Sequence, residues 1–223
     1  MPRPVLLNSW EACYFTFDEA KLLELAAAAK QAGADLFVLD DGWFKGRNDD
    51  ATSLGDWTAD SRKLPGGIPA LCQKVNELGL EFGIWVEPEA VSPDSDLYRA
   101  HPDWALQIPG RDTLQIRNQY TLDFSRAEVR EGIWQQLTAL LDSCPIRYVK
   151  WDMNRHSIAL GAKAHDFVLG LYDILRRIFA PRPQILLETC SSGGNRFDLG
   201  MLCFGPQVWA SDDTDPIERL RIQ

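Results

Sequence analysis

Six short apolar runs alternate with longer stretches of helical character along the chain. The runs cover residues 5–7, 36–39, 82–86, 148–149, 185–187 and 208–209. None of them shows the polar and apolar alternation of a half-exposed strand. Each is therefore predicted to be a parallel strand that is buried on both faces.

The stretches between these runs predict four helices, at residues 18–31, 68–78, about 125–141 and 165–179. The first two stop just before Gly33 and Gly79, and glycine is typical of the position that follows a helix. Ser125 and Glu128 have the spacing of a capping box, which predicts the start of the third helix. The fourth is amphipathic and ends before two prolines.

Polar residues follow every apolar run, at residues 8–10, 40–43, 87–89, 151–154, 188–190 and 211–213. A doubly wound sheet concentrates its chemistry at one switch point, whereas a barrel surrounds its site with loops from all strands. The pattern favours an α/β fold of the (β/α)₈ TIM-barrel type, incomplete, with about six βα units over residues 1–223. Two strand edges would then lack a partner.

Composition and charge exclude several classes of function. The formal charge of −9 over 223 residues offers no basic stripe for nucleic acid. No apolar run is long enough for a bilayer span, and the first residues do not resemble a secretory signal. Five cysteines without a CxxC pair predict free thiols and a cytoplasmic location. Three widely spaced histidines indicate no metal site.

The first candidate for chemistry is the sequence around Asp152. This carboxylate ends the fourth run two residues after Lys150, so both side chains are expected on the same face. A nearby cation favours the ionised form that a nucleophile needs. For an isolated Lys-x-Asp sequence, a structural ion pair is the more common explanation.

The second candidate is the acidic segment after the sixth run, with carboxylates at Asp212, Asp213 and Asp215. A carboxyl group held partly protonated could donate a proton to a departing oxygen. Taken alone, a solvated acidic loop is the simpler interpretation.

Together the two candidates indicate glycoside cleavage, in which one carboxylate attacks the anomeric carbon and the other exchanges protons. Aromatic side chains near strand ends strengthen this interpretation, because sugars stack their CH faces on aromatic rings. Five tryptophans lie in such positions: Trp10, Trp43, Trp85, Trp151 and Trp209.

Asp40 and Asp41 leave the second strand as adjacent carboxylates, which repel each other unless hydroxyl donors or a cation lie nearby. A polyol ligand supplies such donors. A divalent metal is the alternative, and Glu87, Glu89 and Glu188 could join such a site.

The glycine-rich segment at residues 190–196 follows the fifth strand and would let backbone approach a ligand closely. It lacks the lysine and the spacing of a Walker loop, so nucleotide binding is not expected. A catalytic role for Cys190 is conceivable, although no histidine follows a neighbouring strand to activate it.

Seven motifs in series resemble glycoside hydrolase family 36, the microbial α-galactosidases that act on melibiose and raffinose. They are LNSWEA, LDDGWF, GIWVEPE, RNQYTLDF, KWDMNR, CSSGGNRFD and WASDDTD, and they extend over nearly the whole chain.

The resemblance implies a retaining double displacement without a cofactor, with Asp152 as nucleophile and Asp212 as acid/base. It implies that Asp40 and Asp41 bind the 4- and 6-hydroxyls of galactose, and that Cys190 and Gly193 lie near the 2-hydroxyl. The remaining positions that match sugar-binding residues are Trp10, Trp85, Arg117, Lys150 and Asn154.

Family members carry a β-sandwich before the barrel, the last barrel strands and a C-terminal β domain, which we expect to be absent from residues 1–223. The full-length parent is expected to be a homo-oligomer that binds a small galactoside. Three alternatives remain: a galactosyl-transferring synthase with the same barrel, a non-catalytic sugar-binding fragment and a metal-dependent barrel enzyme.

Overall fold

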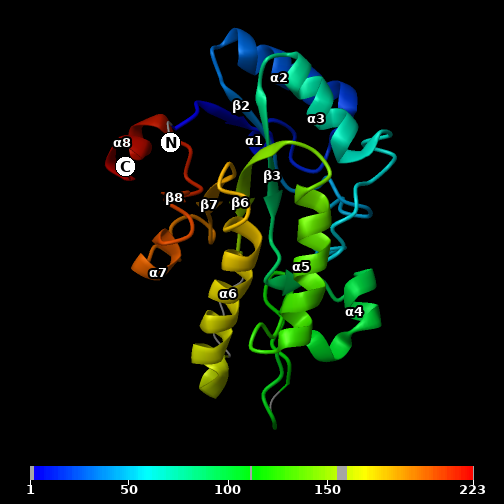
Figure 1. Cartoon of the computed structure of the whole chain (residues 1–223), viewed down its shortest axis with the longest axis vertical. Coiled ribbons are helices and arrows are strands. Elements are labelled where there is room, and N and C mark those ends of the chain that lie inside the picture. Colours follow the sequence, from blue (N-terminus) through cyan, green and yellow to red (C-terminus); the bar gives the residue numbers. More distant parts are fainter. Residues whose placement is uncertain (1–2, 111, 155–159, 223) are drawn as a thin grey trace.

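A computed structural model describes residues 3–110, 112–154 and 160–222. Its main feature is a curved parallel sheet with the strand order β1-β2-β3-β6-β7-β8 (Figure 1). The strands are β1 (Leu6–Asn8), β2 (Leu36–Leu39), β3 (Glu81–Val86), β6 (Ile146–Trp151), β7 (Leu186–Thr189) and β8 (Gln207–Val208). All six predicted strands are confirmed within two residues, as is the incomplete barrel.

Alternate residues of β2, β6 and β7 enter two separate apolar layers. Leu36 and Val38 pack with Tyr148 and Leu186 on the inner, concave side of the sheet. Their neighbour Phe37 belongs to the larger cluster between the sheet and the helices. Both faces of the strands are therefore buried, which explains why the apolar runs are continuous.

Gly83 makes room for the inner layer. It is the register partner of Tyr148, and a Cβ atom at this position would lie 2.8 Å from the Tyr148 Cβ. Only glycine lets the tyrosine ring occupy the concave side here.

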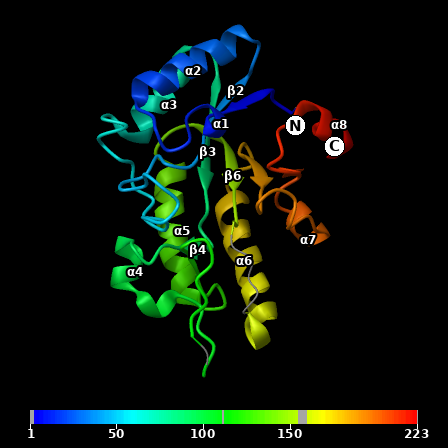
Figure 2. The same cartoon turned by 180° about the vertical axis from the view of Figure 1, so that it is seen from behind.

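The four predicted helices are present as α2 (Glu19–Gln31), α3 (Gly67–Glu77), α5 (Ala127–Leu141) and α6 (Ala164–Phe179). Figures 1 and 2 show α2 beside α3 and α5 beside α6, on the outer side of the sheet. Gly33 and Gly79, which follow α2 and α3, have φ of +91° and +82°, so their predicted role after the helix ends is confirmed.

The predicted capping box at the start of α5 is wrong. Arg126 occupies the cap position and its side chain makes no capping hydrogen bond. The Ser125 hydroxyl instead donates to Asp123, and Glu128 pairs with Arg126. The buried carboxylate of Asp123 competes successfully for the hydroxyl, so the local spacing does not decide the cap.

Short elements that the apolar pattern does not predict complete the fold. They are α1 (Trp10–Cys13), β4 (Ala90–Val91), α4 (Asp96–Ala100), η1 (Pro102–Trp104), β5 (Tyr120–Thr121), η2 (Gly161–Lys163), α7 (Leu199–Leu202) and α8 (Pro216–Ile222). β4 and β5 pair in an antiparallel manner within the long connection from β3 to α5.

The two ends of the sheet curve toward each other, so the N- and C-terminal ends lie side by side in both views (Figures 1 and 2). Arg3 donates to the Pro206 carbonyl at 2.9 Å and to the Gln207 side chain at 3.2 Å. β1 and β8 are the terminal strands of the described sheet, as expected for a sheet with two unpaired edges.

Candidate active site

The inward-facing positions become polar at the carboxyl ends of the strands. In register, Lys150 lies between Trp85 on β3 and Glu188 on β7. The alternation that places Tyr148 inside the barrel continues to Lys150 and then to Asp152. The concave side thus changes from an apolar floor to a ring of charged groups.

One cavity of about 180 Å³ collects most of the predicted site. Its lining includes nine of the eleven predicted residues: Trp10, Asp40, Asp41, Trp85, Arg117, Lys150, Asp152, Asn154 and Asp212. It also includes Phe15, Arg47, Asp50, Glu87 and Gln119. Both candidate catalytic carboxyl groups therefore face the same space.

Asp152 is buried and receives three N–H donors. Trp85 Nε1 donates to Oδ2 at 3.1 Å, Asn154 Nδ2 donates to the same oxygen at 2.9 Å, and the Met153 backbone N–H donates to Oδ1 at 2.8 Å. Such a set of donors suits an anionic carboxylate and fixes its orientation.

Lys150 does not form its direct ion pair with Asp152, contrary to the simplest interpretation of the Lys-x-Asp spacing. Its Nζ donates to Asp40 Oδ2 at 3.0 Å. Burial opposes the charge of Lys150, but the carboxylates of Asp40 and Asp152 outweigh it, so the pKa of Lys150 is raised. The lysine therefore remains a cation between two carboxylates.

Asp41 has a different cation. Arg47 donates through Nε and Nη2 to both of its carboxyl oxygens, at 3.0 and 2.8 Å. Burial nevertheless raises the pKa of Asp41. The adjacent carboxylates at positions 40 and 41 are thus stabilised by two separate partners, which the sequence did not reveal.

Replacing Arg47 by methionine is expected to lower the free energy of unfolding by about 3 kcal/mol, because the carboxylate of Asp41 would stay buried without its cation. Urea unfolding at neutral pH measures the change. The control is Arg99→Met, whose ion pairs with Asp94 and Asp96 are more than half exposed and should contribute much less to stability. Equal losses in the two variants would contradict the expectation.

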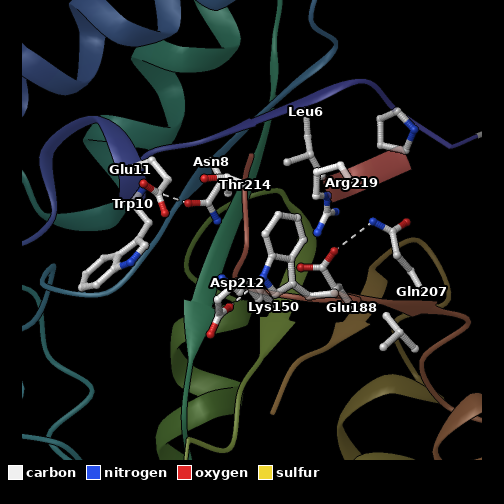
Figure 3. Close-up of a pocket in the computed structure, with 13 residues that line it drawn as sticks. Leu6, Asn8, Trp10, Glu11, Lys150, Glu188, Gln207, Asp212, Thr214 and Arg219 are labelled. Carbon is white, nitrogen blue, oxygen red and sulfur yellow. Dashed lines mark hydrogen bonds between the residues drawn. The ribbon is translucent and has the colours of Figure 1, made fainter. Parts of the chain in front are cut away.

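Asp212 reaches the cavity from the segment after β8. The Trp209 indole donates to its Oδ1 at 2.8 Å. Figure 3 shows Asp212 and Lys150 among the residues around the adjoining, wider cavity of about 500 Å³, which both side chains also line. Asp212 is exposed, and Trp209 is its one side-chain donor among the described residues, so a ligand or water can reach the carboxyl group.

The other acidic residues of this segment have local roles. Asp213 Oδ1 accepts from the backbone of Asp215, and Asp215 Oδ1 accepts from the N–H groups of Ile217 and Glu218 at the start of α8. The acidic segment therefore supplies one cavity carboxyl and a helix cap.

Four of the five predicted tryptophans divide into two groups, and the fifth, Trp209, lines the wider cavity. Trp43 and Trp151 are fully buried in the outer core, so their prediction as sugar platforms is wrong. Their indole N–H groups donate to the Trp85 carbonyl and to Glu89. Trp85 is also buried, but it lines the cavity together with Trp10.

Cys190 and Gly193 do not belong to the described cavity lining. The Cys190 thiol contacts Asp152, and burial raises the pKa of the thiol, so it is not a ready nucleophile. Gly193 lies close to the backbone of Ser211. A Cβ atom on residue 193 would lie only 2.9 Å from the Ser211 Cα. Its place is behind the segment that carries Asp212.

Arg117 enters the cavity from a tight two-residue turn. Arg117 and Asn118 have φ of +51° and +57°, and the flanking residues Ile116 and Gln119 exchange backbone hydrogen bonds. This turn type normally favours glycine or asparagine. A long side chain in the left-handed region at the cavity is a costly arrangement that fits a functional position.

Five lining residues were not predicted as part of the sugar site. Glu87 carried a usable signal, because it follows β3 directly and faces inward like Trp85. The other four lie in connecting segments, where no comparable signal marks them: Phe15, Arg47, Asp50 and Gln119. Tertiary contacts alone bring them to the cavity.

No group of three or more His, Cys, Asp or Glu side chains suited to a metal ion occurs within residues 3–110, 112–154 and 160–222. In the same ranges, none of the helices has the length and apolarity needed to cross a bilayer.

Comparison with known proteins decides the family. The family profile described as Melibiase matches residues 1–223. The chain belongs to the Melibiase family. The expected resemblance to glycoside hydrolase family 36 is confirmed by similar proteins and structures.

Among the relatives, alpha-galactosidase AgaA of Geobacillus stearothermophilus is 52% identical over 99% of this chain and 32% of its own length. The bifunctional alpha-galactosidase/sucrose kinase AgaSK of Mediterraneibacter gnavus is also 52% identical, over 100% of this chain and 24% of its own.

The crystal structure of AgaA superimposes with a TM-score of 0.94, covering 99% of this chain and 32% of that one. A structure of an AgaA variant in complex with raffinose has a TM-score of 0.93 at 52% identity, with the same coverage of both chains. The chain thus spans about a third or less of the length of the relatives it matches.

Proposed function

We propose that the protein hydrolyses terminal non-reducing α-galactosides of the melibiose and raffinose type with net retention. The observation that carries this proposal is the shared cavity, which Asp152 and Asp212 line together with four further carboxyl residues, Asp40, Asp41, Asp50 and Glu87. The relatives support the substrate class, because the similar proteins are named alpha-galactosidases and one is seen with raffinose.

In the proposed first step, Asp152 attacks the anomeric carbon while Asp212 protonates the departing glycosidic oxygen. The bond between the sugar and its leaving group breaks, and an ester forms between galactose and Asp152. In the second step Asp212 takes a proton from water, the water oxygen attacks the anomeric carbon, and Asp152 is released. Side chains supply all the groups that these two steps require.

The remaining lining residues suit a galactose ring. Asp40 and Asp41 provide oxygens for ring hydroxyls, and Lys150, Arg117 and Asn154 provide donors. Trp10 and Trp85 provide apolar surface for the CH face of the sugar. We propose that Cys190 and Gly193 shape the region near the 2-hydroxyl from behind the cavity wall.

The first-formed anomer of galactose tests the reaction. Proton NMR during cleavage of p-nitrophenyl α-galactoside should show α-galactose before the anomers equilibrate, and the β-galactoside should remain intact. First release of β-galactose would contradict retention. Because the relatives are about three times as long, the 223-residue chain and the longest product of its coding sequence are assayed side by side.

We also propose that residues 1–223 act as the partial catalytic barrel of a homo-oligomeric, cytoplasmic enzyme, in which a β-sandwich, the last barrel strands and a C-terminal β domain complete the protein. The five cysteines, none of which forms a disulfide in the described chain, fit a reducing compartment. Light scattering of the longest product measures its oligomeric state.

A further inference from the structure

Glu87 is a buried carboxyl beside Asp152 for which the proposed reaction has no assigned role. It is only 1% exposed, yet it lines the cavity. The Asp152 backbone N–H donates to the Val86 carbonyl at 2.8 Å and continues the pairing of β3 with β6. Val86 is the register partner of Trp151, so the next residues of the two strands, Glu87 and Asp152, lie next to each other.

Asn154 connects the two carboxyl groups. Its backbone N–H donates to Glu87 Oε1 at 2.5 Å, and its side-chain Nδ2 donates to Glu87 Oε2 at 3.0 Å. The same Nδ2 donates to Asp152 Oδ2 at 2.9 Å. The Ser192 hydroxyl donates to Asn154 Oδ1 at 3.1 Å, so each polar atom of the amide has a partner.

No cation pairs with Glu87 among the described residues. Arg47 is the positive group that faces it, but the hydrogen bonds of this guanidinium go to Asp41 and to the Thr52 carbonyl. Asp152, which follows the neighbouring strand β6, faces Glu87. Asp50, Arg117 and Asp212 line the same cavity. Two adjacent buried carboxyl groups cannot both be ionised without a large energetic cost.

We propose that Glu87 is a positioning residue that acts through Asn154. It holds the Asn154 amide so that the amide donates to Asp152, and it remains a neutral acid, so that Asp152 carries the negative charge of the pair. The inference rests on the proposed function, in which Asp152 is the nucleophile.

Burial, reinforced by the charge of Asp152, raises the pKa of Glu87 from 4.5 to about 8. The folded protein therefore keeps a proton that the unfolded chain releases above pH 4.5. The contribution of Glu87 to stability is present in full below pH 4.5 and is lost as the pH rises toward and through 8. The variant Glu87→Gln should lack this part of the pH dependence in unfolding experiments.

The protonation of Glu87 is measured directly by NMR on protein labelled with ¹³C at the glutamate carboxyl carbon. One resonance should titrate near pH 8 and be absent from Glu87→Gln. Glu81→Gln is the control, since Glu81 lies at the exposed, opposite end of the same strand. If all glutamates are ionised at pH 6, the inference is overturned. This measurement needs no turnover, so its outcome is independent of whether the proposed function holds.

A double-mutant cycle tests the route through Asn154. Glu87→Ala should lower kcat by about tenfold to a hundredfold with little change in KM, because a hydrogen bond to a charged group is weakened. Asn154→Ala should lower kcat at least as much and also raise KM, because it removes a proposed contact to the sugar. The double variant should lose no more than Asn154→Ala alone. Independent, multiplying losses would overturn the inference.

Two further measurements separate positioning from a general structural role. In Glu87→Ala, the side-chain amide protons of Asn154 should exchange with solvent faster than in the wild type. Glu87→Gln, which keeps an acceptor and the volume of the side chain, should fold and retain more activity than Glu87→Ala. Unchanged amide exchange in both variants would contradict a role through Asn154.

Discussion

Replacing Asp152 by alanine is expected to reduce the hydrolysis of melibiose and of aryl α-galactosides by about 10⁴-fold or more, because the variant lacks the carboxylate that three N–H donors orient in the cavity and that we propose as the nucleophile. The cavity should stay open, since only one side chain is shortened. Steady-state kinetics with the wild type and the variant measure the loss.

Rescue of the Asp152→Ala variant by azide would identify the missing carboxylate as the nucleophile. A small anion that enters the space of the Asp152 carboxylate would attack the same face of the sugar, so the variant should form β-galactosyl azide from an activated aryl α-galactoside. The control is Asp142→Ala, which removes a carboxylate from an ion pair with Arg182 at the C-terminal end of α5 and should remain active. A fully active Asp152→Ala enzyme would end the assignment of the nucleophile.

Replacing Asp212 by alanine is expected to have an effect that depends on the leaving group. Sugar leaving groups need protonation, so raffinose cleavage should fall by about 10²- to 10⁴-fold. A dinitrophenyl leaving group departs without a proton, so formation of the galactosyl ester on Asp152 should be affected much less. A burst of dinitrophenol followed by slow turnover is the measurement.

The same anion gives the opposite stereochemistry in this second variant. Azide should attack the ester on Asp152 from the face that Asp212 serves, and the product should be α-galactosyl azide. Asp213→Ala is the matched control, because Asp213 is the neighbouring carboxylate and accepts from the Asp215 backbone instead of facing the cavity. Equal losses for raffinose and for the dinitrophenyl substrate would argue against a proton-transfer role.

The positions of the strands along the chain were predictable, because they depend on local patterns of apolar residues. Residues buried on both faces of a parallel sheet must be apolar at consecutive positions, so runs such as 36–39 and 82–86 reveal their strands. Polar residues at the carboxyl ends then identify the face that carries the cavity. The seven motifs identified the family, which the comparisons confirm.

Charge pairing within the site was not predictable from spacing. Lys150 lies two residues from Asp152 in the sequence, yet it donates to Asp40, which is 110 positions away. The nearest charged group in sequence is not the nearest in space when several strands, here β2 and β6 on either side of β3, deliver side chains to a common interior. The cation for Asp41 comes from a loop whose path no periodicity describes.

The parallel strands, the helices that cover them, the family and the two carboxylates proposed for catalysis could all be predicted from the amino-acid sequence. These features follow from burial periodicity and from short motifs, which are properties of neighbouring residues. Three features became visible only in the folded protein: the tryptophans that line the cavity, the pairing of carboxylates with cations, and the connection of Glu87 to Asp152 through Asn154. Such contacts depend on the register between strands and on the paths of the loops, which are set by the packing of the whole chain.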